Sequence, residues 1–358
     1  MERGLPGQED LAADRAPAVA RPDPRGRALR MIAGIGFAAV ILAILIAKVD
    51  GAILAEMVER MPIGGLALAL VIYTLLNVFR AVRYRALLQR EHLPFTSLLA
   101  ISLYHNFLAR VLPFGTGEIS YPLMVRGRLG IRTADSLGSL FAARASEMVM
   151  ILGGGVAGVL TFGDENALLA DFGAPVAALA FVLGVVGLYH AGAIGRLGLR
   201  GYLWVISLPG LSGRRLLARI GAKIEELSAR LDEIRTPRLF ATVLGISLLT
   251  YACNISFNIT LLYSMGLDYD LGLMVVLCTL VMMISWLPIA TASFGIPAAG
   301  WAFGLVAFAG MDVGSATSAG LLLNACQLGA TTINGLAGYA LLNVHRGRIP
   351  LEDARGGA

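Results

Sequence analysis

Charged side chains are scarce in this chain. Only 15% of its 358 residues are Asp, Glu, Lys or Arg, whereas 57% are hydrophobic, and the mean hydropathy is +0.73. Soluble domains of this length carry roughly 25% charged residues. The composition therefore excludes an ordinary soluble domain and predicts an integral membrane protein.

Cysteine is also scarce, and the common catalytic signatures are missing. Cys253, Cys278 and Cys326 lie within apolar runs without CxxC spacing, so neither disulfides nor a zinc site is expected. The sequence contains no HExxH, P-loop, nucleophile elbow or dinucleotide fingerprint. We therefore expect no metal, nucleotide or other cofactor and no enzymatic activity. The net charge of +5 bears on membrane orientation, not on nucleic-acid binding.

Long apolar runs fill most of the chain. A helix needs about 20 mostly apolar residues to cross a bilayer, and most of the runs qualify: 31–47, 61–79, 136–161, 174–195, 239–265, 271–292 and 314–343. Residues 1–30 are mixed in charge, rich in Pro and Ala, and show no signal peptide. We expect a disordered cytoplasmic tail over 1–30, a transmembrane domain over 31–343 and a second cytoplasmic tail over 344–358.

The loop charges predict the orientation. Basic residues predominate in 77–92, 126–132, 192–238 and the C-terminal tail, whereas acidic residues predominate in 49–62, 162–173 and 266–270. Because cytoplasmic loops carry an excess of Lys and Arg, the basic segments are expected inside and the acidic segments outside. The prediction is a multi-pass protein of the plasma (bacterial inner) membrane with both termini in the cytoplasm.

The stretch NFLARVLPFGTGEISYP (106–122) does not fit a simple crossing. Both flanks of residues 93–125 are basic, and two crossings would need about 40 apolar residues where about 33 are present. We expect a re-entrant hairpin that enters over 96–112, turns near Pro113–Gly117 and returns over 118–125. Non-helical backbone is tolerated at membrane depth where protein or a water-filled cavity satisfies it.

The second half contains a similar interruption. Pro288, Gly295, Pro297 and Gly300 break the apolar run of SWLPIATASFGIPAAG (285–300). A second hairpin entering from outside fits, although two full crossings fit the charges as well. We thus expect an all-α protein with about six transmembrane helices and two re-entrant hairpins. Matching Gly/Pro-interrupted segments in two halves are typical of inverted-repeat transporters with a midplane site.

Three segments resemble a known family. RAVRYRALL (80–88), the run from NFLARVLPFGTGE to LGSL (106–140) and RASEMVMIL (144–152) are similar to the lysylphosphatidylglycerol synthase transmembrane-region, or flippase-like, family over about residues 30–343. The family pattern matches at a set of polar and turn positions: Asn106, Pro113, Gly117, Glu118, Arg144 and Glu147. The resemblance implies lipid translocation without the soluble aminoacyl-transferase domain of larger members.

The chain also departs from that pattern. Family arginines near the hairpin are replaced by Phe114 or Thr116 and by Tyr121, and Gly300 stands where the late motif has glutamate. The first hairpin is therefore better supported as a site than the second, and a different substrate would be consistent with the departures.

Two charged pairs are the main candidates for the site. Arg110 and Glu118 lie at hairpin depth, where an ionisable residue costs roughly 2.5 kcal/mol or more and marks function by default. We expect Arg110 to attract an anionic head group and Glu118 to carry a proton or pair with a base; alternatively the two lock the hairpin to each other or to Arg144. Arg144 and Glu147 share a helix face, either as a structural pair or within a network reaching Glu118 or Arg110.

Further polar residues are weaker candidates. Arg80, Arg83 and Arg85 form a cluster that either faces a phosphate or merely fixes topology and binds anionic lipid surfaces; the family resemblance favours the first role for Arg80 and Arg83. Of the pairs Asn254/Asn258 and Asn324/Gln327, one is expected to line the path, without a basis for choosing. His105 is expected to be a satisfied packing residue.

Residues 212–235 predict an amphipathic cytoplasmic helix. Ile220, Ile224, Leu227, Leu231 and Ile234 form a narrow apolar seam. This helix is expected to lie on the membrane surface or on its own bundle; alternatively the seam contacts a second copy or an enzyme partner.

Together these features predict a translocase for an amphipathic lipid that is anionic or of polyprenyl or hopanoid type. The head group would cross a polar midplane cavity between the two hairpins, with Pro288 and Gly295 contributing from the second. The alternative is a non-transporting scaffold or regulator of a lipid- or glycan-modifying enzyme.

Overall fold

The computed structural model describes residues 43–90, 92–112, 116–162, 174–206, 215–285 and 295–344. Every regular element in these ranges is a helix, which confirms the all-α fold. The first half contains α2 (Gly51–Arg60), α3 (Ile63–Leu88), α4 (Phe95–Val111), η2 (Thr116–Ile119), α5 (Ser120–Leu129) and α6 (Thr133–Phe162). The remainder contains α7 (Ala174–Tyr189), α8 (Ala191–Ile206), α9 (Arg215–Asp232), η5 (Glu233–Arg235), α10 (Pro237–Ser264), α11 (Leu271–Ser285), α12 (Gly295–Ala309) and α13 (Val313–Val344).

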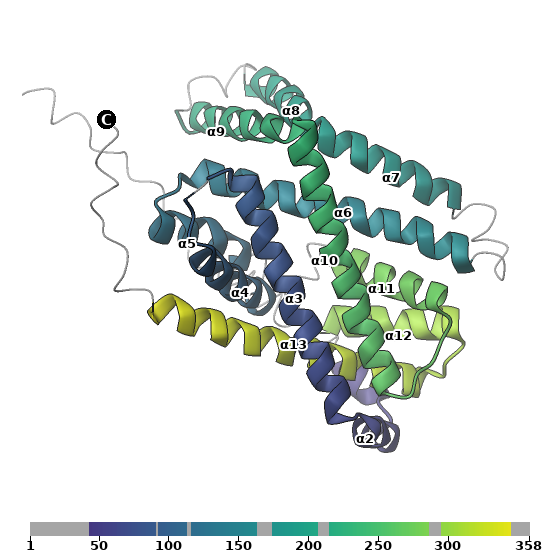
Figure 1. Cartoon of the computed structure of the whole chain (residues 1–358). Helices are drawn as coiled ribbons and strands as arrows, with labels where there is room; N and C mark the ends of the chain where they lie inside the picture. The colour runs from purple at the N-terminus through teal and green to yellow at the C-terminus, as the bar shows by residue number, and fades with distance from the viewer. Residues whose placement is uncertain are drawn as a thin grey trace, which may run out of the picture.

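Helices α3 and α10 pack along each other in opposite directions (Figure 1). Gly65 near the start of α3 contacts Ser264 at the end of α10. The rings of Tyr73 and Phe257 lie 5.1 Å apart further along. Arg83, near the end of α3, donates a hydrogen bond to Ser247 near the start of α10 (3.1 Å). This antiparallel pair joins the two halves of the bundle.

Each half contains a helical hairpin with antiparallel arms. In the first hairpin (α4, η2 and α5), Gly117 lies so close to the backbone of Leu108 and Ala109 that an added Cβ would collide with it. In the second hairpin (α11 and α12), a Cβ at Gly304 would lie 2.8 Å from the side chain of Leu277. Glycine therefore permits the close approach of both pairs of arms.

The hairpins pack across the two halves in a reciprocal way. Helix α4 lies along α13, and α11 lies along α6; α5 packs on α6, and α12 packs on α13. If α3, α4, α5 and α6 are matched with α10, α11, α12 and α13 in that order, each of these contacts has a counterpart in the other half. Because α3 and α10 run in opposite directions, these contacts are the ones that an inverted repeat would produce; the repeat itself stays a prediction.

The loop charges are sorted to two ends of the bundle. At one end Arg90, which follows α3, approaches Asp135 at the start of α6 (3.6 Å), and Arg128 donates to the carbonyl of Leu342 at the end of α13 (3.1 Å). At the other end the hydroxyl of Ser318 approaches the carbonyl of Asp50 (3.4 Å). Both flanks of residues 93–125 therefore lie at the same end of the bundle; that the segment between them is a re-entrant hairpin in the membrane stays a prediction.

Three described helices are long and apolar enough to cross a membrane: α3, α6 and α10. The pair α7 and α8 adds a fourth if counted as one span, although the chain bends by 79° between them. Helix α13 has 32 residues and carries Asn324, Gln327 and Asn334, and it is not among these three. The predicted first crossing over 31–47 falls mostly outside the described residues, which show helix over 43–48.

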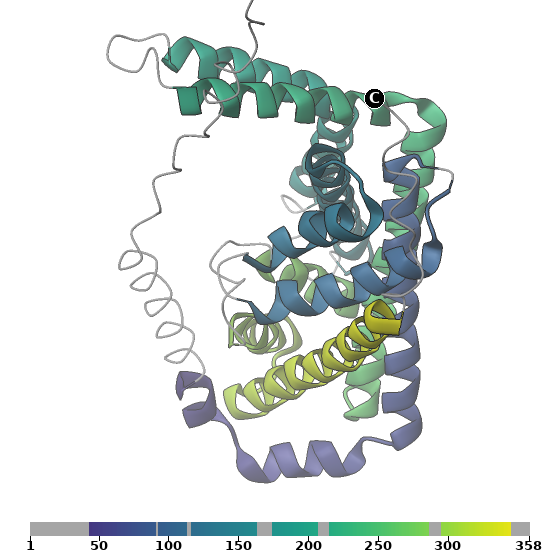
Figure 2. The ribbon, with the colours of Figure 1, turned by 90° about the vertical axis from the view of Figure 1, so that its left-hand side faces the viewer.

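The predicted cytoplasmic helix lies beside α8, across one end of the bundle (Figure 2). Ser228 packs against Gly195 of α8, and Arg196 pairs with Asp232. Leu227 and Arg230 approach Gly138 of α6. Helix α9 thus packs on its own bundle, which was one of the predicted arrangements. Contact of this helix with a second copy or an enzyme stays a prediction.

The close approach at Gly117 can be tested by substitution. Gly117→Ala should lower the free energy of unfolding by about 1–3 kcal/mol, the usual cost of overpacking, because the contacted atoms are backbone. Gly127→Ala in α5 is the matched control, since nothing lies within 4 Å of its added Cβ. Thermal unfolding in detergent, followed by tryptophan fluorescence, measures both. Equal midpoints for the two variants would contradict the tight hairpin.

Candidate functional site

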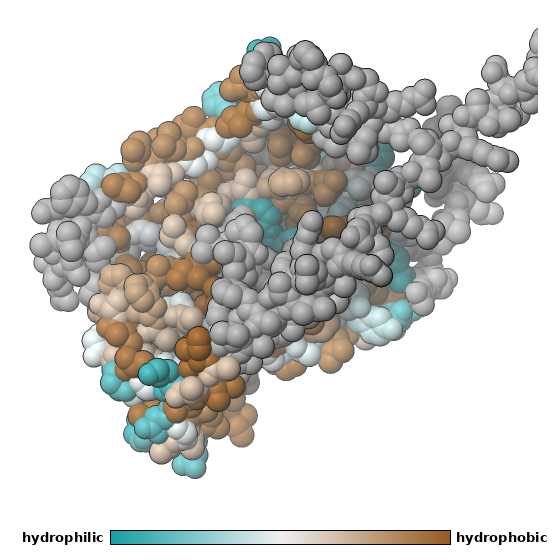
Figure 3. Space-filling view, turned by 180° about the vertical axis from the view of Figure 1, so that it is seen from behind, coloured by the Kyte–Doolittle hydropathy of each residue, from teal (hydrophilic) through white to brown (hydrophobic). Residues whose placement is uncertain are grey.

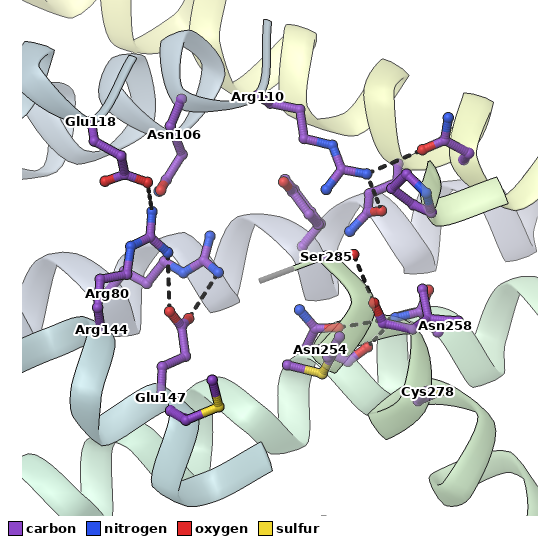
Figure 4. Close-up of a pocket in the computed structure, with 18 of the residues that line it drawn as sticks. Arg80, Asn106, Arg110, Glu118, Arg144, Glu147, Asn254, Asn258, Cys278 and Ser285 are labelled. Carbon is purple, nitrogen blue, oxygen red and sulfur yellow. Dashed lines mark hydrogen bonds and ion pairs between the residues drawn. The ribbon is translucent and has the colours of Figure 1, made fainter. Parts of the chain in front are cut away.

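A cavity of about 750 Å³ lies between the two hairpins. Six parts of the chain supply its walls: α3, the first hairpin, α6, α10, the second hairpin and α13. Figure 4 shows its polar side chains pointing toward a common interior. Seen from behind, the molecule shows a small hydrophilic patch in the middle of a mostly hydrophobic face (Figure 3). The bundle therefore encloses a polar site within an apolar exterior.

Glu147 of α6 is the centre of a buried ion cluster. Its side chain is 5% exposed and accepts a hydrogen bond from Arg80 (3.0 Å) and another from Arg144 (3.1 Å). Arg83, also buried, approaches the same carboxylate at 3.7 Å. One carboxylate thus neutralises only part of the charge of three arginines. Arg80 lines the cavity, and Arg83 lies behind it in contact with the same carboxylate.

Arg144 joins the cluster to the first hairpin. Its guanidinium pairs with Glu118 of η2 while it contacts Glu147 one turn further along α6. Both ends of this bridge face the cavity, where the side chains of Glu118 and Arg144 are 35% and 27% exposed. Arg144 and Glu147 therefore belong to a network of ion pairs that includes Glu118, which was one of the two interpretations of the sequence.

The expected meeting of Arg110 and Glu118 is wrong. Arg110 donates hydrogen bonds to Asn324 (3.1 Å) and Gln327 (2.6 Å) of α13. It lies in the last turn of α4 and points toward α13, whereas Glu118 follows the turn and points toward α6 (Figure 4). The two charges occupy opposite walls of one cavity, each tying the hairpin to a different helix.

Uncharged polar groups complete the walls. Asn254 and Asn258 of α10 line the cavity, and the side-chain amide of Asn258 donates to the side chain of Asn254 (3.0 Å). Asn324 and Gln327 line it as well, so the choice that the sequence left open is resolved in favour of both pairs. Asn106 lines the cavity and donates to Asn77 of α3 (2.7 Å).

The remaining predicted residues differ in their placement. Pro113 and Pro288 lie outside the described residues. Gly117 is buried in the hairpin contact, and Gly295 is the buried first residue of α12; neither lines the cavity. The described part of the second hairpin contributes only uncharged lining residues, among them Ser285 and Trp301. All charged lining residues come from the first half of the chain.

Some participants were missed from the sequence. Asn77 lies one turn before Arg80 on α3, and this i,i+3 spacing could have placed it on the same face. Trp301 of α12 and Tyr73 of α3 line the cavity, but an aromatic residue in an apolar helix carries no signal that separates it from ordinary packing. No group of three His, Cys, Asp or Glu in the described ranges could hold a metal ion.

The fold and site define a class of protein: a polytopic, all-helical membrane protein with a charged cavity between two hairpins. The chain belongs to the family of the lysylphosphatidylglycerol synthase TM region, whose family model matches residues 31–335. This family is membrane-embedded and flippase-like in general. Comparisons with curated proteins and with solved structures found no match.

Proposed function

We propose that this protein moves an anionic, phosphate-bearing lipid across the plasma membrane. The head group passes through the cavity between the hairpins while the acyl or prenyl tails stay in the bilayer. The observation that carries this proposal is the unbalanced charge of the cavity and the cluster behind it. Four arginines, Arg80, Arg83, Arg110 and Arg144, stand against the two carboxylates Glu118 and Glu147.

The excess of two positive charges favours an anion. Unpaired charge is expensive inside a membrane, so the site is stabilised when a ligand supplies the missing negative charge. Arginine presents a planar fork of donors that matches phosphate oxygens, and arginines stand on two walls of the cavity. A neutral hopanoid would leave this charge uncompensated, whereas a phospholipid or a polyprenyl phosphate would neutralise it.

The rest of the lining suits an amphipathic ligand. Apolar side chains stand beside the polar ones, including Phe141, Met148, Met282 and Leu328. Ligand pockets span roughly 300–1,000 Å³, so a cavity of about 750 Å³ accommodates a head group but not a whole lipid. Phe141 is 55% exposed, which places an apolar residue where the cavity lining meets the outer surface.

The reciprocal packing of the halves suggests how the head group changes sides. In inverted-repeat transporters, one repeat rocks against the other around a fixed midplane site. Here the first hairpin is tied to α6 through Glu118 and Arg144, and to α13 through Arg110. Rocking would break and remake these contacts, and an entering phosphate would compete for the same arginines. The two hairpins would then lie in the membrane as re-entrant elements, each opening to its own side.

Reconstitution tests the proposal. Purified protein is placed in phosphatidylcholine vesicles with a trace of tail-labelled phosphatidylglycerol or tail-labelled phosphatidylcholine, and an impermeant reductant reports the outward-facing fraction. We expect phosphatidylglycerol to cross faster than phosphatidylcholine and faster than in protein-free vesicles. A folded protein that moves neither probe would contradict transport and favour the alternative of a scaffold that contacts a partner through α9.

Arg110→Gln is expected to slow movement of phosphatidylglycerol about tenfold, because a hydrogen bond to a charged group contributes roughly 1.5–3 kcal/mol. Arg60→Gln is the matched control, since Arg60 is an exposed arginine paired with Glu56 outside the cavity. The vesicle assay measures both variants at equal protein content. Equal rates for the two variants would exclude Arg110 from head-group binding.

A further inference from the structure

His105 is the buried packing residue that the sequence suggested, but only one of its two ring nitrogens has a hydrogen-bond partner. It lies in α4 with its side chain fully buried, and its Nδ1 is 3.0 Å from the hydroxyl of Ser120. That hydroxyl also lies 2.5 Å from the carbonyl oxygen of Gly117, which can only accept. Ser120 has a single hydroxyl proton and donates it to Gly117. Nδ1 of His105 must therefore carry the proton that it donates to Ser120.

This assignment leaves the other ring nitrogen without a proton when the imidazole is neutral. Nε2 of His105 faces Oε2 of Glu118 at 3.6 Å, and both atoms are buried without a hydrogen-bond partner. Two hydrogen-bond acceptors thus face each other. An unsatisfied buried polar group is destabilising, and a single added proton would satisfy both.

We propose that His105 and Glu118 together bind one proton, and that this proton travels with the anionic head group, so that the protein is a proton–lipid symporter. This inference rests on the proposed function and deepens it by assigning the source of energy. The proton resides on Nε2 of His105 or on Oε2 of Glu118, shared in one hydrogen bond between them. No other bond is made or broken in the step.

The neighbouring charges explain why proton and anion would bind together. Glu118 also pairs with Arg144 through its other oxygen, Oε1. A proton shared with His105 reduces the negative charge that Glu118 presents to Arg144, which frees the guanidinium for a phosphate. By linkage, an anion on Arg144 must then favour the proton by the same free energy.

Titratable and charged groups surround this pair on the elements that pack around it. They are Arg80, Arg83 and Tyr84 of α3, Tyr121 of α5, and Arg144 and Glu147 of α6; α13 contributes the neutral Asn324 and Gln327 to the cavity wall. Glu147 contacts three arginines. Glu118 pairs with one arginine and faces Nε2 of His105, so of the two carboxylates only Glu118 has an acceptor beside it with which a proton could be shared.

The charge balance gives a sharp test. One proton and one singly charged phosphate diester carry no net charge, so a pH gradient should drive phosphatidylglycerol into one leaflet and a potassium diffusion potential should not. A tenfold proton gradient permits at most about tenfold accumulation for each coupled proton. Movement driven by the potential alone, or insensitive to the pH gradient, would overturn the proposal.

Variants locate the proton. His105→Gln and Glu118→Gln should both lose the response to the pH gradient, measured relative to each variant's own exchange rate without a gradient. His92→Gln is the matched control, because His92 is an exposed histidine in the loop before α4. A pH response that survives in both His105→Gln and Glu118→Gln would exclude this pair as the proton site.

A binding measurement separates the two proposals. Phosphatidylglycerol is added to detergent-solubilised protein in weakly buffered solution with a pH indicator. About one proton should be taken up for each lipid bound, and none with Glu118→Gln. Binding and exchange without proton uptake would overturn the symport alone. The absence of both binding and exchange would overturn the proposed function itself.

Discussion

Glu147→Gln is expected to leave little folded protein. Its carboxylate is the shared counter-charge of Arg80, Arg83 and Arg144, and its side chain is 5% exposed. Removing one partner from a buried ion pair costs about 3–5 kcal/mol, because it leaves an uncompensated buried charge. Here three arginines from two helices lose their contact at once, so the effect should lie at the upper end of that range.

Expression in membranes and thermal unfolding in detergent measure this effect. Glu56→Gln is the matched control, because Glu56 pairs with Arg60 at the exposed surface. A second variant tests the same ion cluster if Glu147→Gln alone yields no protein. Glu147→Gln combined with Arg83→Met removes one buried positive charge together with the negative charge, so it should recover part of the folded yield. Near-normal yield and unfolding midpoint for Glu147→Gln would show that the cluster does not hold the bundle together.

The loop charges predicted that both flanks of residues 93–125 lie at one end of the bundle, because such charges act over whole segments. Both flanks of this stretch are basic, and the stretch is too short to cross the membrane twice. The simplest prediction was therefore that the chain returns to the side from which it enters. The structure places Arg90 next to Asp135, which joins those flanks at one end. This kind of prediction needs only charge counts and lengths, both of which a sequence states directly.

Side-chain partners could not be predicted in the same way. Arg110 and Glu118 are eight positions apart and opposite in charge, which made a mutual pair plausible. Their actual partners lie on α13 and α6: Asn324 is 214 positions from Arg110, and Arg144 is 26 positions from Glu118. Arg80 and Arg83 were hard to assign for the same reason, since only their distance from Glu147 separates a site residue from an arginine that fixes orientation.

The two halves share their packing but not their charges. The first half supplies all charged lining residues, while the second supplies uncharged ones such as Asn254, Ser285 and Trp301. A phosphate would therefore be bound by the arginines of the first half, and the lipid tails would extend from the cavity into the bilayer along its apolar lining residues. This asymmetry agrees with a ligand that has one charged end, and it concentrates the expected effects of substitution in α3, α4, η2 and α6.

Arg144→Gln is expected to lower phosphatidylglycerol movement roughly 10- to 100-fold, the equivalent of a charged hydrogen bond of about 1.5–3 kcal/mol. The protein should still fold, because Glu147 keeps Arg80 and Arg83 and the side chain of Arg144 is partly open to the cavity. Arg144→Lys should retain an intermediate rate, since a lysine keeps the charge but loses the fork that reaches two partners.

Arg196→Gln is the control for Arg144→Gln, because Arg196 lies on α8 away from the cavity and pairs with the carboxylate of Asp232 on α9. The vesicle assay gives the rates, and the unfolding midpoint shows whether each variant is folded. The comparison also separates the role of Arg144 from that of Glu147: the former should change transport at normal stability, the latter stability itself. A folded Arg144→Gln protein with the wild-type rate would mean that the head group does not pass between the first hairpin and α6, and the proposed path would be wrong.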